Sequence, residues 1–133
     1  MNPLNWTEQG WSIFFWLMAA WNFALALPAL FRPTLGLRLL FGFARDDSLS
    51  RAQQQLVSLG ILVFGVGYTL VALDPSAGAG LVQLGIVGKL TVLGAFGTLY
   101  FQGRATKIAF AMVLGDGLWS IFYVLFLFGD VPT

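Results

Sequence analysis

Apolar residues run through this chain in four long blocks that polar or small residues separate. The blocks cover about residues 10–31, 54–73, 80–101 and 108–128. Each is close to the roughly 20 residues that an α-helix needs to cross the hydrocarbon core of a bilayer. Because the apolar residues in each block are continuous rather than alternating, membrane-spanning strands are not expected. The pattern predicts an all-α protein, an antiparallel four-helix transmembrane bundle in which residues 1–133 form a single integral membrane domain.

The residues between the blocks predict where the helices begin and end. Ser50 fits the first residue of a capping box at the start of the second helix. Asp74 and Pro75 suit the N-cap and the first position of the third helix. Gly103 stands where a glycine commonly ends a helix, after the third block. Pro28 predicts a kink in the first helix or an early end to it.

The connector between the first and second blocks is itself largely apolar. Two interpretations are open for it. One is an interfacial helix over about residues 34–44, which lies on the cytoplasmic leaflet with its arginines near anionic headgroups. The other is a hydrophobic connector folded under the bundle. The apolar positions do not form a clean helical stripe, so the pattern favours neither. The apolar residues around Arg38 are Leu35, Leu37, Leu39, Leu40, Phe41 and Phe43.

The composition excludes an ordinary water-soluble domain. Hydrophobic residues make up 58% of the chain and charged residues 10%, against about 25% charged residues in globular proteins. The chain has no Cys and no His, so disulfides, Cys/His zinc sites, iron–sulfur clusters and His-ligated haem are not expected. We therefore predict no metal and no cofactor. The net charge of +1 does not suggest nucleic acid as a partner, and the lipid bilayer is the expected one.

The basic residues outside the blocks are confined to two connectors. Arg32, Arg38, Arg45 and Arg51 lie in the first connector, and Arg104 and Lys107 in the third. Residues 1–9, the turn at 74–79 and the tail after 128 contain no Lys or Arg. Because basic loops stay in the cytoplasm, both termini are predicted to lie outside. A cleaved signal peptide is not expected, since no basic residue precedes the first block.

Two charged residues, Lys89 and Asp116, interrupt the third and fourth blocks. On insertion scales each costs about 2.5–3.5 kcal/mol at the centre of a span. Lys89 precedes Arg104 by 15 residues and Asp116 follows it by 12. If the two helices are antiparallel neighbours, this difference of three residues is about 4.5 Å along the axis, which a lysine side chain can bridge. The spacing predicts an ion pair that offsets much of the burial cost.

Three uncharged polar residues extend this candidate site. Asn22, counted from the outer end of the first block, comes to about the same depth as the pair. Asp116, Ser120 and Tyr123 follow one another at i, i+4 and i+7, so they form one polar stripe that leads outward. Such residues often mark a pathway, whereas a buried pair that only fixes helix register is the alternative. Because four helices are expected to enclose little volume, a pathway is expected to need a homodimer.

The aromatic residues near the predicted helix ends suggest interfacial belts. Trp6, Trp11 and Tyr68 suit the outer interface, and Tyr100 suits the inner one. An aromatic cage around a ligand is the less favoured alternative, because belt and packing roles are the usual explanation for such residues.

Four stretches of the sequence resemble a group of small bacterial four-helix membrane proteins and, more loosely, the DoxX-like families. These stretches are LMAAWNFALALPALF, GVGYTLVALDP, LGIVGKL and LGDGLWSIFYV. The resemblance implies four transmembrane helices in a bacterial cytoplasmic (inner) membrane, and it implies no particular activity or ligand. A DoxX-like protein is expected to have a cytoplasmic N-terminus, whereas the basic residues of this chain predict the opposite.

Two hypotheses for function follow. In the first, the protein transports or binds a small solute, ion or proton at Lys89, Asp116 and Asn22, with Ser120 and Tyr123 on the outward side. In the second, it is a non-catalytic accessory or assembly subunit of a larger membrane complex, and its partner is another membrane protein. Catalysis is not favoured, because no second deep carboxylate joins Asp116 and no nucleophile has a base beside it.

Overall fold

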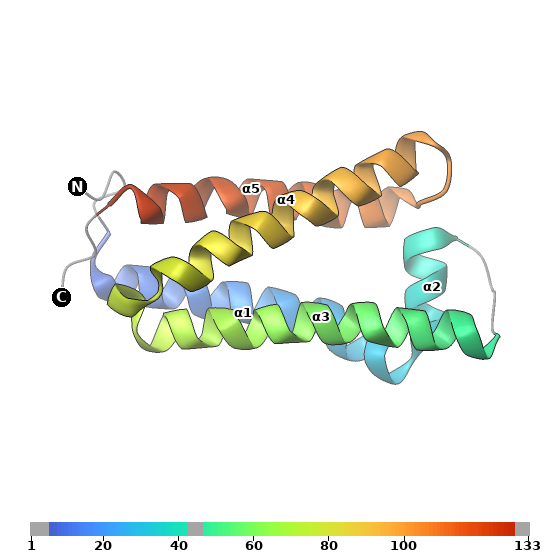
Figure 1. The fold of residues 1–133 in the computed structure, drawn as a ribbon, viewed down its shortest axis with the longest axis horizontal. Coiled ribbons are helices and arrows are strands. Elements are labelled where there is room, and N and C mark those ends of the chain that lie inside the picture. The colour runs from blue at the N-terminus through green and yellow to red at the C-terminus, as the bar shows by residue number, and fades with distance from the viewer. Residues whose placement is uncertain (1–5, 43–46, 130–133) are drawn as a thin grey trace.

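In the computed structural model the chain is built from helices (Figure 1). The structure describes residues 6–42 and 47–129, and over those residues it contains no strand. The elements in chain order are α1 (Glu8–Phe31), α2 (Pro33–Phe41), α3 (Ser48–Leu73), the 3-10 helix η1 (Pro75–Ala77), α4 (Ala79–Phe101) and α5 (Lys107–Leu127). α1, α3, α4 and α5 are long and apolar enough to cross a membrane. The prediction of an all-α fold with four long apolar helices is confirmed, and α2 is a fifth helix beside them.

The start of α3 corrects the predicted capping box. Asp47, not Ser50, is the N-cap: its Oδ1 accepts a hydrogen bond from the Ser50 backbone N–H at 2.8 Å, and its Oδ2 accepts one from Ser50 Oγ at 2.9 Å. The helix therefore begins at Ser48, well before the first apolar residues that defined the block at residue 54. The polar first turns of α3 precede the part that an apolar pattern can detect.

The turn before α4 also differs from the prediction. Asp74 does not cap α4, because Pro75–Ala77 form the 3-10 helix η1 and Gly78 is the N-cap of α4. The Asp74 carboxylate instead accepts a hydrogen bond from Ser76 Oγ at 2.7 Å. Gly78 packs closely on α3, since a Cβ there would lie 2.7 Å from Val71 Cγ1. That close approach explains why a glycine occupies this position.

Of the helix ends predicted from Pro28 and Gly103, the structure contradicts the first and confirms the second. Pro28 lies inside α1, which continues to Phe31, so the predicted early end of the first helix is wrong. Gly103 has φ 72° directly after α4, as the glycine signal predicted.

The long helices are arranged as two pairs. α1 packs along α3, and α4 packs along α5, whereas α3 and α4 touch each other much less. Figure 1 shows α3 and α4 close together at η1 and diverging away from it. The start of α1 and the end of α5 lie at the same end of the molecule as η1, which we call the η1 end. α2 and the turn between α4 and α5 lie at the other end, the α2 end.

Aromatic side chains join the two pairs at the η1 end. Phe126 of α5 packs edge-on against Trp11 and Phe15 of α1, with ring centroids 5.1 Å apart in both contacts. Such contacts contribute about 0.5–1.5 kcal/mol each beyond the burial of apolar area. Trp11 is fully buried in this cluster, so its predicted place in the outer interfacial belt is wrong. Bulky side chains therefore fill the η1 end of the bundle.

α2 packs under the bundle at the other end. It contacts α1, α3 and α5, so it is folded against the bundle, whereas its expected position on the cytoplasmic leaflet stays a prediction. The helix ends at Phe41, and the end of the expected interfacial helix at residue 44 lies outside the described residues. Gly36 permits its close packing, since a Cβ there would lie 2.9 Å from both Ala29 Cβ and Gln54 Nε2.

Thr106, the N-cap of α5, holds the C-terminal end of α2. Its backbone N–H donates to the Leu40 carbonyl at 3.0 Å, and its hydroxyl donates to the Leu39 carbonyl. The same hydroxyl oxygen accepts from the Ala109 N–H at 3.1 Å, which caps α5. Two carbonyls that a helix end would otherwise leave without intrahelical partners are thereby satisfied.

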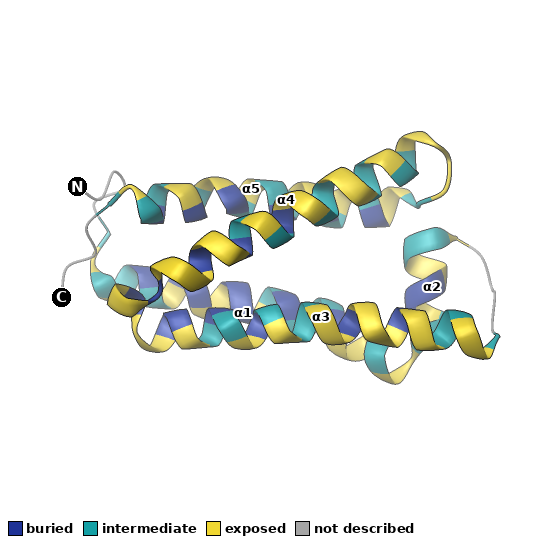
Figure 2. Cartoon of the chain, viewed as in Figure 1, coloured by how far each residue is buried: buried dark blue, intermediate teal, exposed yellow. Residues whose placement is uncertain are grey.

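The outer faces of the four long helices are apolar and exposed (Figure 2). Val63 of α3 and Val87 of α4, for example, have 66% and 62% of their surface exposed. Monomeric soluble proteins rarely expose apolar patches of such extent. These helices are compatible with a small multi-pass membrane protein whose outer faces contact the lipid bilayer.

Candidate functional site

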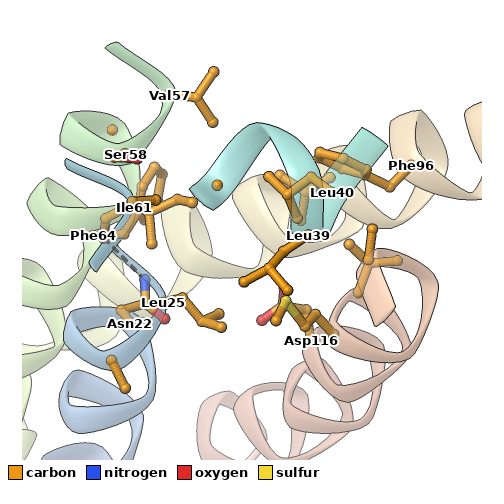
Figure 3. A pocket seen from close by; sticks show the side chains of 18 of the residues that line it. Asn22, Leu25, Leu39, Leu40, Val57, Ser58, Ile61, Phe64, Phe96 and Asp116 are labelled. Carbon is orange, nitrogen blue, oxygen red and sulfur yellow. Dashed lines mark hydrogen bonds between the residues drawn. The ribbon is translucent and has the colours of Figure 1, made fainter. Parts of the chain in front are cut away.

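A cavity of about 460 Å³ lies between the two helix pairs (Figure 3). It reaches from Lys89 and Asp116 toward α2, and side chains of all five α-helices line it. Its volume falls within the roughly 300–1,000 Å³ that is typical of small-molecule sites. The expectation that the helices of one chain leave little volume is therefore wrong, and the homodimer inferred from it stays a prediction. α2 and the divergence of α3 from α4 create the space.

The ion pair predicted from the spacing of Lys89 and Asp116 is present at one end of this cavity. Lys89 Nζ donates to Asp116 Oδ1 at 2.8 Å, and the two residues are only 4% and 8% exposed. The buried residues of α4 are Val82, Gly85 and Lys89, which fall on one face of the helix. The lysine therefore lies on the face that α4 turns toward the protein, not toward lipid.

Trp21 also contacts the ion pair, and the sequence did not identify it as a site residue. Its indole Nε1–H donates to the same Asp116 Oδ1 at 3.2 Å, so one carboxylate oxygen joins α1, α4 and α5. The Trp21 ring packs on Gly115, where a Cβ would lie 3.1 Å from Cζ2. Nothing in the apolar pattern marks Trp21, because tryptophan is common at buried and interfacial positions alike.

Two tyrosine rings face the Lys89 ammonium group. The centroid of the Tyr68 ring is 5.3 Å from Lys89 Nζ, and that of Tyr123 is 5.6 Å away. These distances are within the range of cation–π attraction, which is stronger where water is excluded. Tyr68 is only 2% exposed, so its predicted place in the outer belt is wrong. It belongs to the site.

Counting residues from the turn at Asp74 predicts that Tyr68 lies at nearly the same depth as Lys89. It lies 6 residues before Asp74, and Lys89 lies 10 residues after Ala79. The difference of four residues is about 6 Å along the helix axis, close to the length of a lysine side chain. The same count that paired Lys89 with Asp116 therefore also brings Tyr68 within reach.

Asn22 lines the same cavity, but the bond that the structure gives it is to α3. Its Nδ2 donates to the Ile61 carbonyl at 3.1 Å, as the dashed line in Figure 3 marks. Asn22, Lys89 and Asp116 all line the cavity. Their role in a ligand or ion pathway stays a prediction.

Ser120 and Tyr123 lie on the other side of the pair from the cavity. Ser120 Oγ donates to the Asp116 backbone carbonyl at 2.9 Å, and Tyr123 is fully buried in the aromatic cluster of the η1 end. Neither residue lines the cavity. The cavity extends toward the α2 end, whereas the predicted pathway along these two residues leads toward the η1 end.

The walls of the cavity are mostly apolar. Phe64 of α3 reaches across to α4 at Gly88, where a Cβ would lie 2.9 Å from Phe64 Cζ. On the α3 wall, the Ser58 hydroxyl donates to the Gln54 carbonyl of its own helix at 2.9 Å. The apolar lining residues include Leu25, Leu35, Leu39, Leu40, Ile61, Phe96, Met112 and Val113. The polar lining residues are Lys89, Asp116, Asn22, Tyr68, Gln54, Ser58 and Thr91.

No family model, no curated protein and no solved structure matches the chain. The resemblance to small bacterial four-helix membrane proteins therefore stays a prediction, and the geometry of the site is what carries a functional argument.

Proposed function

We propose that this protein binds a small molecule in the cavity, with Lys89, Asp116 and Asn22 as its polar contacts. The observation that carries the proposal is that a buried ion pair lines an otherwise largely apolar cavity of about 460 Å³. Convergent polar groups in an apolar cavity are the usual composition of a small-molecule site. An ion pair that served only to set helix register would have no need of a cavity beside it.

We further infer that the molecule lies in a bacterial inner membrane as an antiparallel bundle with both termini outside. The distribution of basic residues supports this orientation. Arg32, Arg38, Arg51, Arg104 and Lys107 belong to α2, to its flanks, or to the loop and helix starts at the α2 end. Arg45 lies outside the described residues. The rule that basic segments stay in the cytoplasm then places the α2 end inside.

Photolabelling of the cavity tests whether it binds small molecules. The probe is 3-trifluoromethyl-3-phenyldiazirine, a small apolar compound whose carbene inserts into neighbouring bonds on illumination. In nanodiscs, we expect labelling at buried lining residues such as Val113 and Asp116 to saturate with probe concentration. Labelling of lipid-facing residues such as Val63 is expected to rise linearly, because it reports only partition into the bilayer.

Ser120 and Tyr123 provide the internal control for this experiment. They are as buried as the lining residues and lie on the same helix, but they do not line the cavity, so they are expected to remain unlabelled. Labelling confined to lipid-facing residues would contradict the proposal. The pair would then serve helix register alone, as the hypothesis of an accessory subunit requires.

A further inference from the structure

We propose that the ligand is an uncharged amphiphile, with one hydroxyl or carbonyl head and an apolar body, that enters the cavity from the bilayer. This inference rests on the proposed binding function and names the class of molecule that the same cavity would take. It is carried by the net charge of the buried pair, by the unequal ends of the cavity and by the position of its rim.

The charges around the polar end favour an uncharged head. Lys89 and Asp116 compensate each other at 2.8 Å, so a charged head would lack a counter-charge in the interior. An anion would lie near the Asp116 carboxylate, and a cation near the Lys89 ammonium group. Burying an uncompensated charge costs far more than burying a hydrogen-bonded neutral group. A hydroxyl or carbonyl oxygen, by contrast, can accept from Lys89, whose ammonium carries three N–H donors.

The other end of the cavity is suited to an apolar body. Leu35, Leu39 and Leu40 of α2 line it there. Figure 3 shows Leu39 and Leu40 on α2, with Asn22 away from them on α1. Gln54 is the polar exception at this end, and its amide packs against Gly36 of α2. A molecule that fills the space would place its head at the pair and its body toward α2.

The rim of the cavity lies on the lipid-facing sides of the helices. Val57 and Gly60 of α3 and Thr91 of α4 line the cavity and are also exposed, and all three lie within spans. α3 and α4 diverge at this level. The aromatic cluster fills the η1 end and α2 covers the α2 end. The lateral side between α3 and α4 therefore offers a route from the hydrocarbon core, which suits a molecule that partitions into it.

Four decyl compounds that differ only in the head test the inference. The probes are 1-decanol, decanoate, decylammonium and decane, added to the protein in phosphatidylcholine nanodiscs at about pH 9, where both charged heads are ionised. Competition against the saturable diazirine labelling of Val113 measures their binding. We expect 1-decanol to compete best, by about tenfold over decane, which is the gain that one net hydrogen bond provides. The two charged probes are expected to compete more weakly than 1-decanol.

A matched pair of glycine variants tests the lateral route. Gly60 and Gly94 both lie in spans and both face open space: within the part of the chain that the structure describes, a Cβ at either position would have no atom within 4 Å apart from its chain neighbours and its own helix backbone. Only Gly60 lines the cavity. We expect Gly60→Leu to slow the onset of competition after 1-decanol is added, and Gly94→Leu to leave that rate unchanged. Equal behaviour of the two variants would overturn entry between α3 and α4.

The outcomes separate this inference from the proposal on which it rests. If a charged probe competes best, or if decane competes as well as 1-decanol, the neutral amphiphile is wrong while cavity binding stands. If no decyl probe competes although the diazirine labelling saturates, the inference fails and the proposed binding function again stands. If no saturable labelling is found inside the cavity, both fail together.

Discussion

The carboxylate of Asp116 lies where three helices meet, and its Oδ1 atom accepts hydrogen bonds from both Lys89 and Trp21. Each donor comes from a different helix, so loss of either donor removes a contact between two helices as well as an electrostatic interaction. Removing a single partner of a buried ion pair costs about 3–5 kcal/mol, because the remaining charge is left without compensation. The indole N–H, as a neutral donor to a charged acceptor, is expected to contribute less.

Trp21→Phe tests that smaller contribution. The variant removes the Nε1–H that donates to Asp116 and part of the ring that packs on Gly115. We expect the free energy of unfolding in detergent to fall by about 1.5–3 kcal/mol, the range for hydrogen bonds to charged groups. Trp16→Phe is the control, because Trp16 is exposed on the same helix, and a change within about 0.5 kcal/mol is expected there. Equal effects of the two variants would contradict the role given to Trp21.

Counting residues from the helix ends predicts which side chains lie at the same depth, but not which of them contact one another. Lys89 and Asp116 could be paired from the sequence because both are charged, both are deep and a short link joins their helices. Depth counting also reaches Tyr68, but residue type did not single out Tyr68 or Trp21, because an aromatic residue fits the interface, the core and a ligand site equally well. The bond from Asn22 to the Ile61 carbonyl depends on side-chain direction, which depth counting does not include.

At the scale of elements, α2 determines whether the cavity is closed at one end. The helix is short, at 9 residues, and helices of this length are marginal without tertiary contacts. Its packing at Gly36 and the two hydrogen bonds from Thr106 to Leu39 and Leu40 supply those contacts. The order of α2 should therefore depend on Thr106.

Thr106→Val tests this dependence. The variant removes the hydroxyl that donates to Leu39 and caps α5, while it retains the shape of the side chain. Loss of such a cap costs about 0.5–2 kcal/mol, and we expect hydrogen exchange over residues 33–41 to accelerate. Thr98→Val is the control, because the Thr98 hydroxyl donates to the Gly94 carbonyl of its own helix. Unchanged exchange in α2 would show that Thr106 does not hold it.

The element boundaries that the sequence missed have a common cause. An apolar pattern detects the part of a helix that lies in lipid, and the polar first turns of α3 from Ser48 lie outside that part. Asp and Ser are both good N-caps, so residue type alone does not show that Asp47 rather than Ser50 begins the helix. The turn at Asp74 differed because Gly78 packs against Val71, a tertiary contact that local signals do not contain.

At the scale of the whole molecule, the distribution of side-chain sizes produces a space that opens away from the η1 end. Trp11, Phe15 and Phe126 fill the η1 end, whereas toward the α2 end the two helix pairs diverge around the cavity. The sequence predicts the four long helices because each is a local pattern. It does not predict the cavity, which depends on how far α3 and α4 separate.

Single cysteines test the proposed orientation, and the chain has no native cysteine to interfere. Ser76 at the η1 end and Gln102 at the α2 end are both exposed. In intact bacterial cells we expect a membrane-impermeant maleimide to label Ser76→Cys, and to label Gln102→Cys only after permeabilisation. The reverse pattern would place the termini in the cytoplasm, and labelling of both sites in intact cells would indicate dual topology.

A double-mutant cycle on the ion pair, read out by both stability and binding, tests the central claim most directly. The variants are Lys89→Met, Asp116→Leu and their combination, and the readouts are thermal stability and saturable diazirine labelling competed by 1-decanol. We expect each single change to destabilise the protein, because it leaves one charge buried without its partner. The double variant should be more stable than either single variant and fall short of wild type only by the share of the Trp21 hydrogen bond to Asp116, yet lose the advantage of 1-decanol over decane. A double variant that folds and still prefers 1-decanol as wild type does would contradict the claim that this pair is the polar end of a binding site.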